Sequence, residues 1–273
     1  MTDRGDPVAP PPRGGSPRAA IMVTCLVDLF YPQVGEAMVR LLGRHGVEVR
    51  VPAGQTCCGL PLFNSGYHHE AARVARRTLP LFADADAVVV PSGSCAWMVK
   101  AEYPHLFPDD PALTATARAL AARTYELSQY LVGVLGLEEA GGRPRGARRV
   151  TYHDSCHLLR GLGESRAPRT LLAGAGVELA ELAGADECCG FGGSFAVRLP
   201  DVSGAILRRK LESIRATGAD TVVACDAGCL MQIAGGAGQA RDRIRVRHLA
   251  ELLADTDEPD ERGDALSTSG GLG

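Results

Sequence analysis

Cysteines are the residues of this sequence whose type and spacing could do chemistry. The chain has 273 residues and nine cysteines. Eight of them repeat one pattern, which is a single cysteine, an adjacent pair followed by glycine, and a last single cysteine. Corresponding cysteines are 131 residues apart at the first three positions and 134 apart at the fourth, which indicates a tandem duplication. The first set is Cys25, Cys57, Cys58 and Cys95, and the second set is Cys156, Cys188, Cys189 and Cys229.

Four thiolates per half are a donor set for a soft metal centre. Structural zinc usually takes its ligands from two short Cys-x-x-Cys segments, which neither set contains. Adjacent cysteines can instead bind neighbouring iron atoms of one cluster. Gly59 and Gly190, which follow the pairs, allow backbone N–H groups to approach cluster sulfurs. We therefore expect an iron–sulfur cluster of the 4Fe–4S type in each half. Zinc in one half and buried, inert thiols are the alternatives.

The composition excludes several classes of function. Lys and Arg total 29 against 32 Asp and Glu, so no strongly basic surface for nucleic acid or anionic lipid is expected. The sequence contains no run of about 18 apolar residues, so no membrane span is predicted. The Pro-rich start of the chain also lacks the apolar run of a signal peptide. Many thiols without an export signal indicate metal or redox chemistry in a reducing compartment. The expected location is the cytoplasm.

Short strands must position the cysteines. Runs typical of strands at 21–24 and 150–152 end just before the first cysteine of each set, and runs at 88–90 and 221–224 precede the last one. Helical patterns alternate with these strands, which predicts an α/β fold, a tandem duplication of a βαβ-type cysteine-rich domain with parallel sheets and flanking helices. Because ligands gather at the carboxyl ends of parallel strands, four thiols should converge at one sheet edge per half. Also expected are a strand at 47–51 and helices at 34–45, 70–82 and 201–216.

Stretches rich in Gly, Pro and Arg indicate where the chain divides. Both ends contain too few apolar residues to join a core, and a third such stretch lies near the middle. The predicted division is a disordered tail at 1–20, a first cysteine-rich repeat at 21–139, a linker at 140–149, a second repeat at 150–254 and a disordered tail at 255–273.

The motifs resemble a known family. The duplicated Cys…Cys-Cys-Gly…Cys pattern is similar to the cysteine-rich CCG domain of heterodisulfide reductases and related iron–sulfur oxidoreductase subunits. The segments from Pro52 to Gly59 and from Tyr152 to Leu158 resemble the lactate-utilisation members of that family. The resemblance implies an iron–sulfur subunit of a cytoplasmic complex that oxidises L-lactate to pyruvate. It also implies two partners, a ferredoxin-type iron–sulfur subunit and a third small subunit. The alternatives are a thiol/disulfide redox subunit and a zinc-stapled scaffold without catalysis.

The sequence departs from the broader family at one position in each half. Many relatives end the motif with Cys-x-x-Cys and so have five thiols, whereas Ser92 and Asp226 stand three residues before the last cysteine here. Four ligands per half therefore favour an ordinary four-thiol arrangement. The ninth cysteine, Cys225, is either a fifth ligand through a local bulge or a small buried apolar residue at a strand end.

Acid–base candidates surround the first cysteine of the second set. His153, Asp154 and His157 could remove a proton from a 2-hydroxy acid, since this needs a base with a pKa near neutral. The alternative interpretation is that they orient the Cys156 loop through hydrogen bonds around the metal ligands.

Overall fold

A computed structural model describes residues 16–142 and 144–255. It contains two four-stranded parallel sheets, which confirms the predicted α/β fold with one sheet per half. Of the tails expected at 1–20 and 255–273, residues 1–15 and 256–273 lie outside the described residues. The first sheet has the order β2-β1-β3-β4 and the second β6-β5-β7-β8. The strands are β1 Arg18–Ile21, β2 Glu48–Arg50, β3 Ala87–Val90, β4 Thr124–Glu126, β5 Arg149–Tyr152, β6 Glu178–Leu179, β7 Thr221–Ala224 and β8 Arg245–His248.

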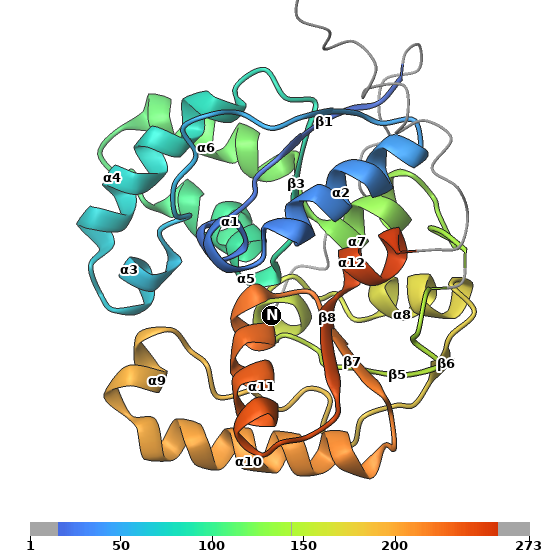
Figure 1. Ribbon diagram of the computed structural model, residues 1–273. Helices are drawn as coiled ribbons and strands as arrows, with labels where there is room; N and C mark the ends of the chain where they lie inside the picture. Colours follow the sequence, from blue (N-terminus) through green and yellow to red (C-terminus); the bar gives the residue numbers. More distant parts are fainter. Residues whose placement is uncertain (1–15, 143, 256–273) are drawn as a thin grey trace, which may run out of the picture.

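Helices connect the strands and flank the sheets (Figure 1). Those of the first half are α1 Cys25–Phe30, α2 Pro32–Arg44, α3 Leu60–Asn64, α4 His68–Thr78, η1 Leu79–Phe82, α5 Gly93–Trp97, η2 Met98–Glu102, η3 Tyr103–His105, α6 Pro111–Ala122, α7 Leu127–Gln129 and η4 Tyr130–Val134. Those of the second half are η5 His157–Gly161, α8 Arg166–Gly174, α9 Ser194–Arg198, α10 Pro200–Ala216, α11 Ala227–Gln239 and α12 Leu249–Ala254. Among the described residues no helix is long and apolar enough to cross a membrane.

The central strands β3 and β7 explain why both sheets are buried. Their sequences, AVVV and TVVA, are buried at every position, as expected of parallel strands covered on both faces. Alternate residues of β3 face different cores: Val89 contributes to a core shared by the halves, while Val88 packs into a core of the first half alone. The strand order reverses between β1 and β3, and between β5 and β7, which is where ligands bind in open α/β sheets.

Residues in two of the stretches expected to be irregular belong to the folded structure. The first strand begins at Arg18, so residues 18–20 are part of the sheet rather than of a tail. Ala19 and Ala20 are small enough to be buried between flanking helices, and Arg18 forms an ion pair with Asp86 beside the next strand. In the expected linker, Ala140 and Ala147 are buried in the shared core, so this stretch packs against the halves that it joins.

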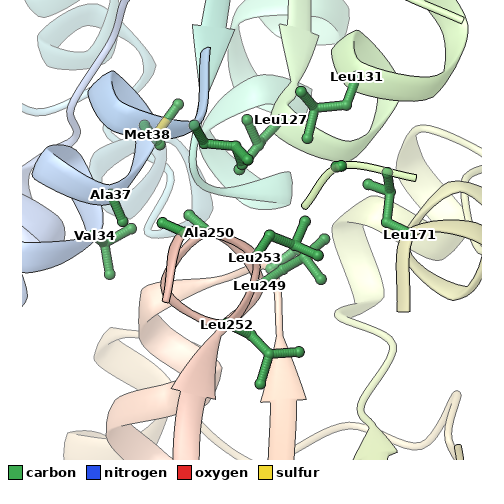
Figure 2. Close-up of a cluster of buried hydrophobic side chains, with 14 of the residues drawn as sticks. Val34, Ala37, Met38, Leu127, Leu131, Leu171, Leu249, Ala250, Leu252 and Leu253 are labelled. Carbon is green, nitrogen blue, oxygen red and sulfur yellow. The ribbon is translucent and has the colours of Figure 1, made fainter. Parts of the chain in front are cut away.

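Reciprocal helix packing joins the halves. The helix α12, the last one within the described residues, packs against α2 of the first half, and α7 at the end of the first half packs against α8 of the second (Figure 1). Figure 2 shows the apolar side chains that meet there. The ones labelled are Val34, Ala37, Met38, Leu127, Leu131, Leu171, Leu249, Ala250, Leu252 and Leu253. The duplicated units are therefore one structure with a common core.

Polar contacts cross the same junction in pairs. The His248 ring, at the start of α12, is 2.8 Å from the carbonyl oxygen of Pro91 at the end of β3. In the other direction, the Glu126 carboxyl at the start of α7 lies beside the thiol of Cys225 at the end of β7. Pro91 and Cys225 are 134 residues apart and so occupy equivalent positions. The junction has approximate two-fold character, with different chemistry on its two sides.

Glu126 makes the stability of this junction depend on pH. Its side chain is fully buried, and this burial raises the pKa of the carboxyl to about 7 although Ser128 donates to it. Between the usual pKa and about 7 the unfolded chain releases a proton that the folded chain keeps, so stability falls as pH rises through this window. We expect Glu126→Gln to remove that loss, because the amide keeps an acceptor for Ser128.

The measurement is the free energy of unfolding in urea. Glu126→Gln should gain up to about 3 kcal/mol over the wild type between about pH 5 and pH 8. The groups around Glu126 are Glu164, Tyr152 and Cys225, and none of them is changed in this variant. If the free energies of unfolding of the variant and the wild type differ by the same amount at about pH 5 and at about pH 8, Glu126 does not titrate in this window.

Candidate metal centre

The sulfur atoms of the first set lie in a row. Cys25 follows β1, the pair Cys57–Cys58 follows β2, and Cys95 lies one turn after β3. The Cys25 thiol is hydrogen-bonded to Cys57, and Cys57 in turn contacts Cys58. The row ends where the Cys58 thiol donates to the Cys95 sulfur at 3.1 Å. The structure thus brings together the four cysteines that the spacing groups into one site.

The second set repeats this row in the same order. Cys156 is hydrogen-bonded to Cys188, and Cys188 to Cys189. The Cys189 thiol then donates to the Cys229 sulfur at 3.4 Å. Corresponding strands, β5 to β7, position the four residues. Two equivalent rows of four sulfurs are the geometric result of the duplication.

A glycine after each cysteine pair shapes the loop. Gly59 and Gly190 both have φ of +90°, a conformation that side chains rarely adopt. Each glycine then directs its backbone N–H to the first sulfur of the pair, at 3.3 Å in both halves. These bonds stabilise a negative charge on Cys57 and on Cys188.

One cysteine in each row is held as a thiolate. Hydrogen bonds from Cys25 and Cys58 lower the pKa of the Cys57 thiol to about 3. Hydrogen bonds from Cys156 and Cys189 likewise lower the pKa of the Cys188 thiol to about 2. The same contacts raise the pKa of Cys25 and of Cys156. The thiolate is the form of cysteine that ligates metals, so Cys57 and Cys188 are in the ligating form before a metal binds, and the other cysteines of each row lose their protons on binding.

The donor set fits a soft metal centre. Four sulfurs in each row, each in contact with its neighbour and two of them buried, match the thiolate ligands of iron–sulfur clusters or zinc. A hydrogen bond from the core also fixes the loop of the first set, because the buried Tyr103 hydroxyl donates to the Cys58 carbonyl at 2.9 Å. In the second set the Ser203 hydroxyl donates to the Gly190 carbonyl at 2.8 Å, so both sets combine suitable ligands with a supported backbone.

Both sets open into one cavity, which we call the shared cavity. It has a volume of about 210 Å³ and lies where the strand ends of the two halves meet. The loops after the cysteine pairs approach each other beside it, with the hydroxyl oxygens of Ser65 and Ser194 3.2 Å apart. Its lining includes Cys25, Cys57, Cys58, Cys95, Cys156, Cys188, Cys189 and Cys229, together with Ser92, His157, Phe191 and Asp226.

Ser92 and Asp226 bond to each other across the halves. The Ser92 hydroxyl donates to the Asp226 carboxylate at 2.9 Å, and the backbone N–H of Ser94 donates to the same oxygen at 3.0 Å. The other carboxylate oxygen accepts from the N–H of Gly228, so Asp226 also caps α11. The two positions that stand three residues before the last cysteine of each set thus join the halves beside the shared cavity.

Cys225 lies away from both rows of sulfurs. It is completely buried, and its sulfur accepts from the Tyr152 hydroxyl at 3.4 Å and lies beside the Glu126 carboxyl. Among the described residues that line the shared cavity, Cys225 is missing. The geometry supports the interpretation as a buried core residue and gives no support to a fifth ligand.

The three acid–base candidates have different surroundings. Both carboxylate oxygens of Asp154 accept from Arg169, at 2.9 and 2.8 Å, which supports a structural role. His157 lines the shared cavity with its ring against Trp97 and its Nδ1 3.7 Å from the Cys156 sulfur, and burial lowers the pKa of the ring. His153 is 1% exposed, and burial lowers the pKa of its ring to about 3.

The sequence did not indicate that the two sets meet. The duplication predicts two equivalent sites, but the cavity that they share depends on how the halves pack. The sequence also does not predict the bond between Ser92 and Asp226. Their separation of 134 residues, the same as that of Cys95 and Cys229, indicates only that the two positions are equivalent.

Comparisons with known proteins agree with these observations. The family described as "CCG: Cysteine-rich domain" matches residues 19–100 and 150–234. A protein named lactate utilization protein A from Shouchella clausii (strain KSM-K16) is 48% identical, over 86% of this chain and 97% of that protein. The one of Bacillus subtilis (strain 168) is 44% identical over 86% of this chain and 98% of that protein.

A solved structure supports the fold alone. A hypothetical protein from Helicobacter pylori superimposes with a TM-score of 0.60 at 11% identity, covering 98% of this chain and 54% of that one. The chain thus spans about half of that protein.

Proposed function

The chain belongs to the family of cysteine-rich CCG domains, and on that premise we propose that it is an iron–sulfur subunit of a lactate-utilisation system. The relatives named lactate utilization protein A are matched over nearly their whole length, which supports the same role in lactate utilisation. In this proposal the chain works in the cytoplasm with a ferredoxin-type iron–sulfur subunit and a third small subunit, in a complex that oxidises L-lactate to pyruvate.

The single observation that carries the proposal is the pair of four-sulfur rows at one cavity. The first set would hold one cluster and the second set another, expected to be of the 4Fe–4S type. When bound, such clusters supply one-electron chemistry. Oxidation of L-lactate to pyruvate releases two electrons and two protons, so a chain with two such sites has the capacity for both electrons.

The protein contributes binding, hydrogen bonds and burial. The Gly59 and Gly190 N–H groups stabilise charge on Cys57 and Cys188, and hydrogen bonds of this kind to sulfur raise the reduction potential of a centre. The bond between Ser92 and Asp226 fixes the distance between the sets. Burial of Cys58 and Cys189 keeps water from the deepest sulfur of each row.

The test is purification without oxygen, followed by measurement of iron and acid-labile sulfide. The proposal expects a coloured protein with iron and sulfide in equal amounts in both halves. A colourless protein with stoichiometric zinc in both halves would overturn it and favour the zinc-stapled scaffold.

The shared cavity also favours a second candidate, thiol/disulfide reduction. A disulfide substrate needs access to redox-active sulfurs, and the exposed Cys188 lies at a cavity lined by both sets. Reconstitution with the two proposed partner subunits separates the candidates. Lactate-dependent reduction of a dye supports the first proposal, whereas disulfide-dependent oxidation of a reduced dye without any response to lactate supports the second.

A further inference from the structure

Among the buried positions near the sulfur rows where the two halves differ, one holds a histidine in the second half alone. His153 in the second half corresponds to Met22 in the first, 131 residues earlier. Each residue directly follows the first strand of its half, and each donates its backbone N–H to the central strand. The Met22 bond to the Val89 carbonyl measures 3.0 Å, and the His153 bond to the Val223 carbonyl measures 2.9 Å. The backbone is equivalent, so the difference lies in the side chains alone.

The His153 ring lacks hydrogen-bond partners although it is buried. The residue is 1% exposed, and among the described residues neither ring nitrogen has a partner. An imidazole has at least one donor and one acceptor, and leaving such a group unpaired costs about 1–3 kcal/mol. Met22 carries no comparable cost, because a thioether is apolar and packs into the core of the first half. A buried histidine without a partner therefore requires an explanation.

The cysteines of the second set offer an explanation for the unpaired His153 ring. A ring nitrogen of His153 and the sulfurs of Cys189 and Cys229 all lie within 4.8 Å of one another. Ligands of one tetrahedral metal ion lie about 3.5–4 Å apart, so a small movement brings these three atoms to ligand spacing. Imidazole binds iron and zinc readily, and it replaces thiolate in some iron–sulfur centres.

We propose that His153 is a ligand of the metal centre in the second half, so that this centre has nitrogen and sulfur donors and the first has sulfur donors alone. The inference rests on the proposed function in one respect, that the cysteines hold metal. It makes the two centres chemically different although their cysteines are equivalent. Met22 excludes the same ligation from the first half.

The decisive probe is a histidine nitrogen coupled to the metal. The protein is labelled with ¹⁵N-histidine, purified without oxygen, reduced, and studied by pulsed electron paramagnetic resonance. We expect a strongly coupled nitrogen in the wild type. His153→Met gives the second half the residue found in the first. This variant should lose the nitrogen coupling and keep the paramagnetic resonance spectrum of the first centre.

Two further variants make the assignment specific. His157→Gln removes the other histidine near the second set, whose Nδ1 is 3.7 Å from the Cys156 sulfur, and should keep the coupling. Met22→Leu makes a similar apolar change in the first half and should also keep it. Absence of a coupled nitrogen in an iron-loaded wild type would overturn the inference, as would a signal that disappears with His157→Gln. If His153→Met fails to fold, the labelled wild type together with His157→Gln still shows whether a histidine nitrogen other than that of His157 is coupled to the metal.

The failure of this inference can be told apart from failure of the proposed function. If the protein contains zinc and no iron, the iron–sulfur proposal fails. X-ray absorption at the zinc edge then shows whether a nitrogen ligand is present and whether His153→Met replaces it with sulfur or oxygen. A zinc shell of sulfur alone, or a protein that binds neither metal, would overturn the His153 ligation as well.

Discussion

Cys188→Ser is expected to empty the second half of its metal while the first half keeps its own. Cys188 is the thiolate of its row and contacts both Cys156 and Cys189, so its loss interrupts the donor set in the middle. Serine has nearly the same size, but its hydroxyl is a hard ligand and stays protonated at neutral pH. We expect iron and acid-labile sulfide to fall to about half of the wild-type content.

The matched variants are Cys57→Ser and Cys225→Ala. Cys57→Ser should cause the complementary loss from the first half, and the double variant with Cys188→Ser should contain almost no metal. Cys225→Ala should keep the full metal content, because the Cys225 sulfur contacts Tyr152 and Glu126 rather than either row. Full iron content in Cys188→Ser, or a loss in Cys225→Ala as large as that in Cys188→Ser, would contradict the ligand assignment.

Gly190→Ala is expected to destabilise the fold much more than Gly59→Ala. Both glycines have φ of +90°, so any side chain adds strain of about 1–2 kcal/mol at either position. A Cβ at Gly190 would lie 2.6 Å from the Ser203 carbonyl oxygen in α10, whereas at Gly59 the nearest atom is the Ala71 oxygen at 3.4 Å. The overlap with backbone at Gly190 adds about 1–3 kcal/mol.

Urea unfolding of the two variants under identical metal loading measures this difference. Gly190→Ala should lose about 3 kcal/mol or more of unfolding free energy, and Gly59→Ala about half of that. Gly190→Ala should also weaken metal retention in the second half, since the same residue donates its N–H to the Cys188 sulfur. Equal losses in both variants would show that α10 moves away from the added methyl group at little cost.

Much of the local structure could be predicted from the sequence. The strand at 221–224 and the helix beginning near residue 34 agree with β7 and α2, because period and β-branching are properties of short segments. The sequence does not predict the start of β1, because Arg18, Ala19 and Ala20 have little preference for a strand and adopt one only between β2 and β3. Tertiary pairing overrides weak local preference there.

The sequence by itself determined the duplication, the parallel α/β halves and the membership of eight cysteines in two sets. These follow from spacing along the chain and from the rule that ligands collect at strand ends. Only the tertiary structure decided that the sets share one cavity, that Ser92 bonds to Asp226, and that the ring of His153 approaches Cys189 and Cys229. Such contacts depend on how two folded halves pack through α2 and α12, and packing between distant segments leaves no period in the sequence.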